Sequence, residues 1–210
     1  MKIITINIVK LIVFALVFLT ACNSPKQFLI VSYNVENLFD TIQNSGGLDT
    51  DFIPDSKKQY NEEKYNSKLN NIAKVLSSID EKQLPDIIGL VEIENRNVLE
   101  DLKNQKSLAK AKFEISHFEG PDPRSIEVAL LYSTNFKLLS EQPIAVHTDS
   151  AKRYRSRDIL YVKGIMNSDT LHVFVNHWKS RSGGEEKTQG NRLAAANTLR
   201  QVTDSLLNRN

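Results

Sequence analysis

The chain has 210 residues, of which 40% are hydrophobic and 25% charged, with 27 Lys and Arg against 25 Asp and Glu. This length suits one domain with a sizeable core, and no repeat or low-complexity linker divides the sequence. The near-neutral charge excludes the strong basic field of a dedicated nucleic-acid binder, although a local basic patch stays possible.

The N-terminus has the pattern of a processing signal. Residues 1–21 carry two lysines, Lys2 and Lys10, before an apolar core, Leu11–Leu19, that is too short to span a membrane comfortably. The segment Leu19-Thr20-Ala21-Cys22 resembles a bacterial lipobox, in which the cysteine is acylated and becomes the first mature residue. We therefore expect an exported protein that Cys22 anchors to the cell envelope, in the periplasm or outer membrane. An uncleaved anchor helix is the alternative.

Residues 28–210 would then form the domain, after a polar tether at 22–27. Phe28–Tyr33 and Ile87–Ile93 are continuous apolar runs, which is typical of strands covered on both faces. Between them, Asn61–Ile79 places apolar residues at helical spacing. Removing residues 1–21 also removes two lysines and no acid, so the mature domain would hold 25 basic and 25 acidic residues.

The second half of the chain continues with a helix and then several strands. The pattern predicts a helix at Asn97–Leu108 and a closing helix at Arg192–Leu207. Between them we expect five short strands, at Phe113–Phe118, Glu127–Tyr132, Phe136–Ser140, Ile159–Met166 and Leu171–Asn176. Helices alternating with strands, followed by a strand meander, indicate an α/β (α+β) fold with a mixed sheet and helices packed outside.

A long loop holds the segment Gly46–Asp51, between the first strand and the first helix. Loops of this length are often functional rims, and a solvated insertion is the other interpretation. The ligand spacing of an EF-hand calcium loop is absent.

Polar residues gather at the ends of three predicted strands. Asn34 and Glu36 follow the first, and Glu92 lies at the end of the second. Asn176-His177-Trp178-Lys179 lies at the end of the predicted strand Leu171–Asn176. Carboxylates hold hard cations, while Asn, His and Lys grip phosphate, so this set suits metal-assisted phosphoryl chemistry. Glu94 would share the face of Glu92 if its strand continues.

These motifs resemble the endonuclease/exonuclease/phosphatase superfamily, which includes DNase I-like nucleases, abasic-site endonucleases and sphingomyelinases. The resemblance runs from about Phe28 to the last helix. It implies part of a two-sheet α/β sandwich with outer helices. It also implies that Glu92, helped by Glu36, binds Mg²⁺ (or Mn²⁺ or Ca²⁺), and that Asn34, Asn176 and His177 are catalytic residues at the scissile phosphate.

Two cations complete the predicted phosphate site. Asp122-Pro123-Arg124-Ser125 resembles the family's arginine turn, and Lys179 belongs to its Asn-His-x-Lys-Ser segment. Arg124 could clamp phosphate oxygens in a bidentate manner, or it could be structural, pairing with Glu127 or with loop carbonyls. A wider basic rim around the site, or else a solvated charge run, would comprise Arg153, Arg155, Arg157, Lys179, Arg181 and Lys187.

Two motifs of the superfamily are missing from the sequence. The Gly-Asp-x-Asn segment supplies an aspartate that activates water, and a Ser-Asp-His segment supplies a histidine for proton transfer, but the 210 residues contain no Gly-Asp pair and no Asp-His pair. We therefore expect a truncated copy of a metal-dependent phosphoesterase, with C-terminal segments missing. Its substrate would be a nucleic acid, a nucleotide, a lipid head group or a sugar phosphate, and no protein partner is predicted. The alternatives are a non-catalytic lipoprotein that binds phosphorylated ligands or a protein, and a gene fragment.

Overall fold

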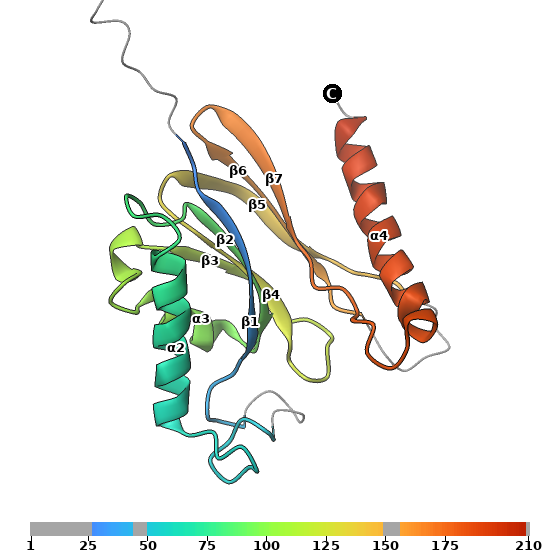
Figure 1. Ribbon diagram of the computed structural model, residues 1–210. Helices are drawn as coiled ribbons and strands as arrows, with labels where there is room; N and C mark the ends of the chain where they lie inside the picture. Colours follow the sequence, from blue (N-terminus) through green and yellow to red (C-terminus); the bar gives the residue numbers. More distant parts are fainter. Residues whose placement is uncertain (1–26, 44–49, 149–155, 209–210) are drawn as a thin grey trace, which may run out of the picture.

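The structure, a computed structural model, describes residues 27–43, 50–148 and 156–208. The predicted signal peptide, Cys22, most of the Gly46–Asp51 loop, Arg153 and Arg155 lie outside the described residues. The described elements form two β-sheets with α-helices outside them, which confirms the predicted α/β class (Figure 1).

The first sheet has four strands in the order β1-β2-β4-β3. Its strands are β1 (Ile30–Leu38), β2 (Ile87–Ile93), β3 (Glu114–His117) and β4 (Glu127–Tyr132). β1 and β2 are parallel because a helical crossover joins them, while β4 runs antiparallel to β2 and to β3.

The second sheet is an antiparallel meander in the order β5-β6-β7. Its strands are β5 (Phe136–Ile144), β6 (Ile159–Met166) and β7 (Asp169–Val175). The two sheets enclose a core to which β2 and β4 contribute Ile87 and Leu130, while β6 and β7 contribute Val162 and Val175. β2 is apolar on both faces because Ile87 faces this core whereas Ile88 and Leu90 face the helices.

Helices cover the outer faces. α2 (Glu62–Ser77) and α3 (Arg96–Lys103) pack on the first sheet, and a 3₁₀ turn, η1 (Ala109–Ala111), precedes β3. Asparagine side chains cap both α-helices: Asn61 accepts from the amide of Lys64, and Asn95 accepts from that of Val98.

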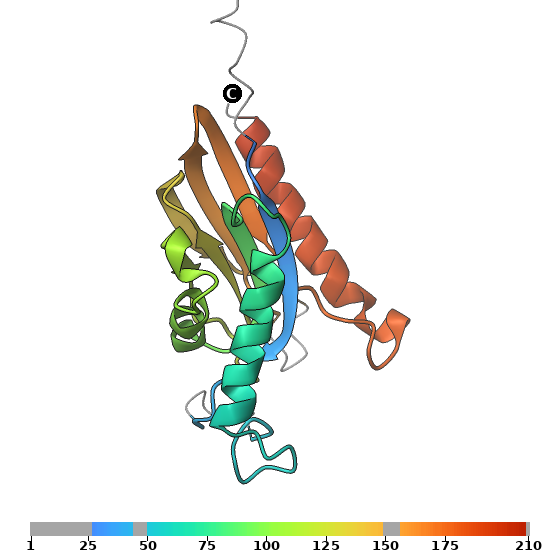
Figure 2. The same ribbon diagram turned by 60° about the vertical axis from the view of Figure 1, so that its left-hand side comes forward.

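α4 (Glu185–Leu207) lies on the other side of the sandwich from α2 (Figures 1 and 2). Its Ala195 is buried in a small cluster with Ile159 of β6, against which Phe174 of β7 also packs. Among the described residues, no helix combines the length and apolarity needed to cross a bilayer.

Candidate active site

Backbone bulges shape the strand ends that carry the predicted site residues. On β1, Asn34 pairs with Val91 and Leu38 with Ile93, so β1 holds more residues than β2 between the two pairs. Glu36 and Asn37 lie in this bulge with φ of 56° and 62°, a left-handed conformation that non-glycine residues rarely adopt. Asn34 and Glu36 therefore lie inside β1, Asn34 just before the bulge and Glu36 within it, and not beyond the end of a strand as predicted.

Glu92 occupies a second distortion, on β2. Its φ is 68°, and the register with β4 shifts between Val91 and Ile93. The shift breaks the alternation of side chains, so Glu94 does not share the face of Glu92 as predicted. The Glu94 side chain is buried, and its Oε2 accepts from the amide of Asp40 at 2.7 Å.

Two predicted site residues, one from each sheet, approach a carboxylate oxygen of a third, Glu92. Asn34 Nδ2 donates to Glu92 Oε1 at 3.0 Å, and His177 Nε2 lies 3.4 Å from the same oxygen. Asn34 Oδ1 in turn accepts from the amide of Glu36 at 2.8 Å, so the asparagine links the β1 bulge to β2. Residues that lie up to 143 positions apart in the sequence thus form one polar cluster spanning both sheets.

The surroundings of His177 favour its neutral form. Burial lowers the pKa of His177, the positive charge of Arg157 lowers it further, and the carboxylate of Glu92 opposes both effects. The net effect is a pKa below the ordinary histidine value, which favours the uncharged imidazole. Its Nδ1 is buried and has no hydrogen-bonding partner among the described residues.

A buried carboxylate beside His177 bridges two arginines. Asp122 Oδ2 lies 3.1 Å from Arg124 Nη2 and 3.0 Å from Arg157 Nε. The Asp122 side chain is 0% exposed and that of Arg157 is 7% exposed, whereas that of Arg124 is 41% exposed. Burial by itself raises the pKa of Asp122, but hydrogen bonds from Arg124 and the charges of both arginines outweigh it and lower the pKa.

Arg157 connects this ion cluster to the histidine. Its Nη1 donates to the carbonyl oxygen of His177 at 3.1 Å, and its Nε also lies 3.0 Å from the carbonyl of Ile126. Arg157 does not belong to a solvated charge run, because its guanidinium is buried and contacts Asp122 and two backbone carbonyls. The suggested pairing of Arg124 with Glu127 is also corrected, since Asp122 is the carboxylate that Arg124 contacts.

The remaining predicted residues lie around this centre. Glu36 is exposed on the β1 bulge, and Lys179 is partly buried two positions after His177. Asn176 makes local hydrogen bonds: its Nδ2 donates to the carbonyl of Phe174, and its Oδ1 accepts from Trp178 Nε1. These bonds turn the chain that follows β7.

A carboxylate such as that of Glu92 is a suitable ligand for a divalent cation. Among the described residues, no three His, Cys, Asp or Glu side chains are grouped so that they could hold a metal ion. Glu92 Oε1 accepts from Asn34 Nδ2 and lies near His177 Nε2, whereas no hydrogen bond to Oε2 is found among the described residues. Magnesium commonly takes one or two carboxylates and completes its shell with water and substrate oxygens. Glu92 can supply one such carboxylate, and Glu36 is the other predicted metal-binding carboxylate, exposed on β1.

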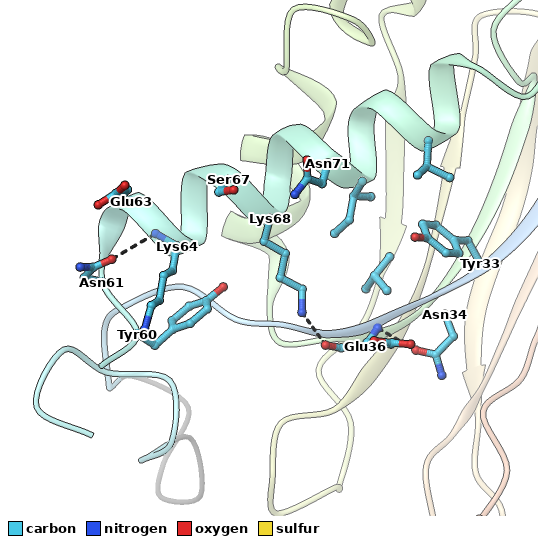
Figure 3. A pocket seen from close by; sticks show the side chains of 13 residues that line it. Tyr33, Asn34, Glu36, Tyr60, Asn61, Glu63, Lys64, Ser67, Lys68 and Asn71 are labelled. Carbon is cyan, nitrogen blue, oxygen red and sulfur yellow. Dashed lines mark hydrogen bonds between the residues drawn. The ribbon is translucent and has the colours of Figure 1, made fainter. Parts of the chain in front are cut away.

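Sequence reasoning missed Lys68 and the bridging role of Asp122. Lys68 lies on α2, and its ammonium reaches the β1 bulge (Figure 3). Lys68 lies in no motif, and Asp122 lies in the predicted arginine turn, whose sequence does not indicate that the carboxylate also contacts Arg157.

The fold and the site together define a class, the DNase I-like two-sheet sandwich with its polar centre at the strand ends. The chain belongs to the endonuclease/exonuclease/phosphatase family, whose sequence profile matches residues 29–210. The name of the family denotes enzymes that hydrolyse phosphate esters.

Solved structures support the fold. TDP2 from C. elegans is 14% identical, with a TM-score of 0.52 over 71% of this chain and 40% of that chain. TDP2 from D. rerio, complexed with single-strand DNA product, is 16% identical, with a TM-score of 0.51; the match covers 85% of this chain and 54% of the TDP2 chain. SmcL is 15% identical, with a TM-score of 0.51; the match covers 89% of this chain and 60% of the SmcL chain. The chain thus spans between 40% and 60% of the length of these structures. No curated protein matches the chain.

Proposed function

We propose that the protein is a divalent-metal-dependent phosphoesterase that cleaves a phosphodiester or a phosphomonoester by attack of water. The observation that carries this proposal is the convergence of Asn34, Glu92 and His177, from both sheets, on one carboxylate oxygen. Family membership supports the same reaction class.

Glu92, with Glu36, would hold Mg²⁺, or Mn²⁺ or Ca²⁺ in its place. A bound cation supplies charge neutralisation and polarises a phosphate oxygen. Neutral His177 can donate a hydrogen bond through Nε2, and Asn34 through Nδ2, to oxygens whose negative charge grows as the phosphorus is attacked. Arg124, which is partly exposed, and Lys179 would contact the remaining phosphate oxygens.

In the proposed step, a water oxygen bonds to phosphorus as the bond to the leaving oxygen breaks. The water proton needs a base, and the family resemblance assigns proton transfer to the Gly-Asp-x-Asn and Ser-Asp-His motifs, which these 210 residues do not contain. Loss of general-base assistance costs about 10² to 10⁴ in rate. We therefore expect slow turnover from this chain, with binding of metal and phosphate retained.

Candidate substrates share a phosphate ester: nucleic acid, nucleotide, lipid head group or sugar phosphate. The D. rerio TDP2 complex contains a single-strand DNA product, which keeps nucleic acid among them. The near-neutral charge balance provides no strong general attraction to polyanions, so local contacts would set the choice.

We also propose that the protein is exported and anchored to the cell envelope by a lipid on Cys22, after removal of residues 1–21. The support is the sequence pattern at 19–22. In bacterial cells that express the full chain, we expect a labelled fatty acid to be incorporated into the wild-type protein and not into Cys22→Ser. Equal labelling of both proteins would contradict the proposal.

The purified full chain should hydrolyse bis(p-nitrophenyl) phosphate or p-nitrophenyl phosphate in the presence of Mg²⁺ or Mn²⁺. Release of p-nitrophenol, followed at 405 nm, should fall to background after EDTA treatment and return when the metal is added back. His177→Ala should lower the rate by about 10² to 10³, the usual cost of losing a hydrogen-bond donor to the transition state. Metal binding without any turnover would favour the alternative, a non-catalytic protein that binds phosphorylated ligands.

A further inference from the structure

Lys68 reaches from a helix to the distorted part of β1. It lies on α2, is partly buried, and borders an open pocket of about 650 Å³ between α2 and β1 that Asn34 and Glu36 also line. Its Nζ donates to the carbonyl oxygen of Glu36 and, at 3.0 Å, to that of Asn37. Figure 3 shows the side chain pointing across the pocket toward Glu36.

These two carbonyls belong to the consecutive left-handed residues of the β1 bulge, with φ of 56° and 62°. Such a conformation persists only where surrounding contacts hold it. The amide of Glu36 is held by Asn34 Oδ1, and the carbonyl of the same residue is held by Lys68. The bulge is thus fixed from both sides, and one of the two contacts comes from a different element.

The ammonium of Lys68 also lies near both predicted metal-binding carboxylates. Burial lowers the pKa of Lys68, while the negative charges of Glu36 and Glu92 oppose that effect. One cation therefore interacts with two carboxylates that would otherwise repel each other in the metal-free protein.

We propose that Lys68 is a positioning residue, which fixes the β1 bulge and thereby places Asn34 and Glu36 beside Glu92 for metal binding. The part of this proposal that concerns metal binding rests on the proposed function, whereas the part that concerns the β1 bulge does not. The role does not require Lys68 to touch substrate or metal, because it acts through the backbone of residues 36 and 37. It extends the site to a helix that carries none of the other predicted site residues.

The test compares the full chain with Lys68→Met, which keeps the aliphatic stem and removes the ammonium, and with Lys68→Arg, which keeps a cationic donor. Lys64→Met is the matched control, because Lys64 lies one turn earlier on α2 and its Nζ donates to the carbonyl of Lys58, away from the bulge. Two quantities are measured: amide hydrogen exchange of residues 36–38 in metal-free protein, and Mn²⁺ affinity by electron paramagnetic resonance.

In Lys68→Met we expect faster exchange at residues 36–38 and Mn²⁺ binding weaker by about 10-fold to 100-fold, the usual effect of losing a group that orients a metal ligand. Lys68→Arg should have an exchange rate at residues 36–38 and a Mn²⁺ affinity close to those of the wild type. Lys64→Met should match the wild type in both quantities. Exchange elsewhere in β2 and β4 should be unchanged, which a general loss of stability would not produce.

Unchanged exchange at the bulge in Lys68→Met would overturn the proposal, and so would Mn²⁺ binding that is unchanged or tighter. If the wild-type chain binds no Mn²⁺, the metal part of the proposed function fails. The exchange comparison in metal-free protein then still decides whether Lys68 holds the bulge.

Discussion

Replacing Glu92 by Gln should weaken Mn²⁺ binding by more than about 100-fold, since losing a group that only orients a metal ligand already costs about 10-fold to 100-fold. Gln keeps the size of the side chain and an oxygen that can accept from Asn34 Nδ2, so the cluster can persist. What disappears is the negative charge that a hard cation requires. Titration of free Mn²⁺ by electron paramagnetic resonance measures the difference directly.

Asp169→Asn is the matched control, because it also removes one carboxylate but at the start of β7, the end of the strand opposite His177. It should bind Mn²⁺ as the wild-type chain does. Thermal unfolding of Glu92→Gln should show that the variant is folded. If Glu92→Gln and the wild-type chain bind Mn²⁺ equally, Glu92 is not the metal ligand.

The second large effect concerns stability. Asp122→Asn should lower the free energy of unfolding by about 3 kcal/mol or more, because it leaves the guanidinium of Arg157 buried without its counter-charge. Urea denaturation followed by circular dichroism measures the change. Asp204→Asn is the control, since Asp204 pairs with Arg200 on the exposed surface of α4 and should change the free energy of unfolding by only about 0.5 kcal/mol.

The pH dependence of this effect follows from the lowered pKa of Asp122. The contribution of its charge to stability is fully present above the ordinary aspartate pKa of about 3.9, and it is lost as the pH falls through the lower pKa of the folded state. The difference in the free energy of unfolding between Asp122→Asn and the wild type should therefore become smaller at acidic pH. A difference that is absent at pH 7 would show that the ion pair does not stabilise the fold.

Much of the fold follows from apolar patterns in the sequence. The predicted bounds of Ile87–Ile93, Glu127–Tyr132 and Ile159–Met166 coincide with β2, β4 and β6, since each is mostly apolar and mostly buried. The closing helix begins at Glu185 and not at Arg192, because its first turns are polar and give no periodic signal. β1 extends to Leu38 and not to Tyr33, because its end is a bulge of polar residues.

The proximity of three candidate site residues could be expected from sequence motifs, whereas their roles stay a prediction. Asn34, Glu92 and His177 were selected from their places at strand ends, and the structure brings them to one carboxylate oxygen. Lys68 and the role of Arg157 were not predictable, since each depends on backbone carbonyls distant in the sequence. Nothing in the local sequence signals that a left-handed bulge needs a cation to hold it.

The central claim is that strand ends from both sheets form one divalent-metal site at Glu92. The most direct measurement is an anomalous difference map from crystals of the full chain soaked in Mn²⁺. The account predicts a peak in coordinating contact with the Glu92 carboxylate, on the side of Glu36, with Asn34 and His177 adjacent. A well-ordered Glu92 without such a peak, or Mn²⁺ bound only elsewhere, would contradict it.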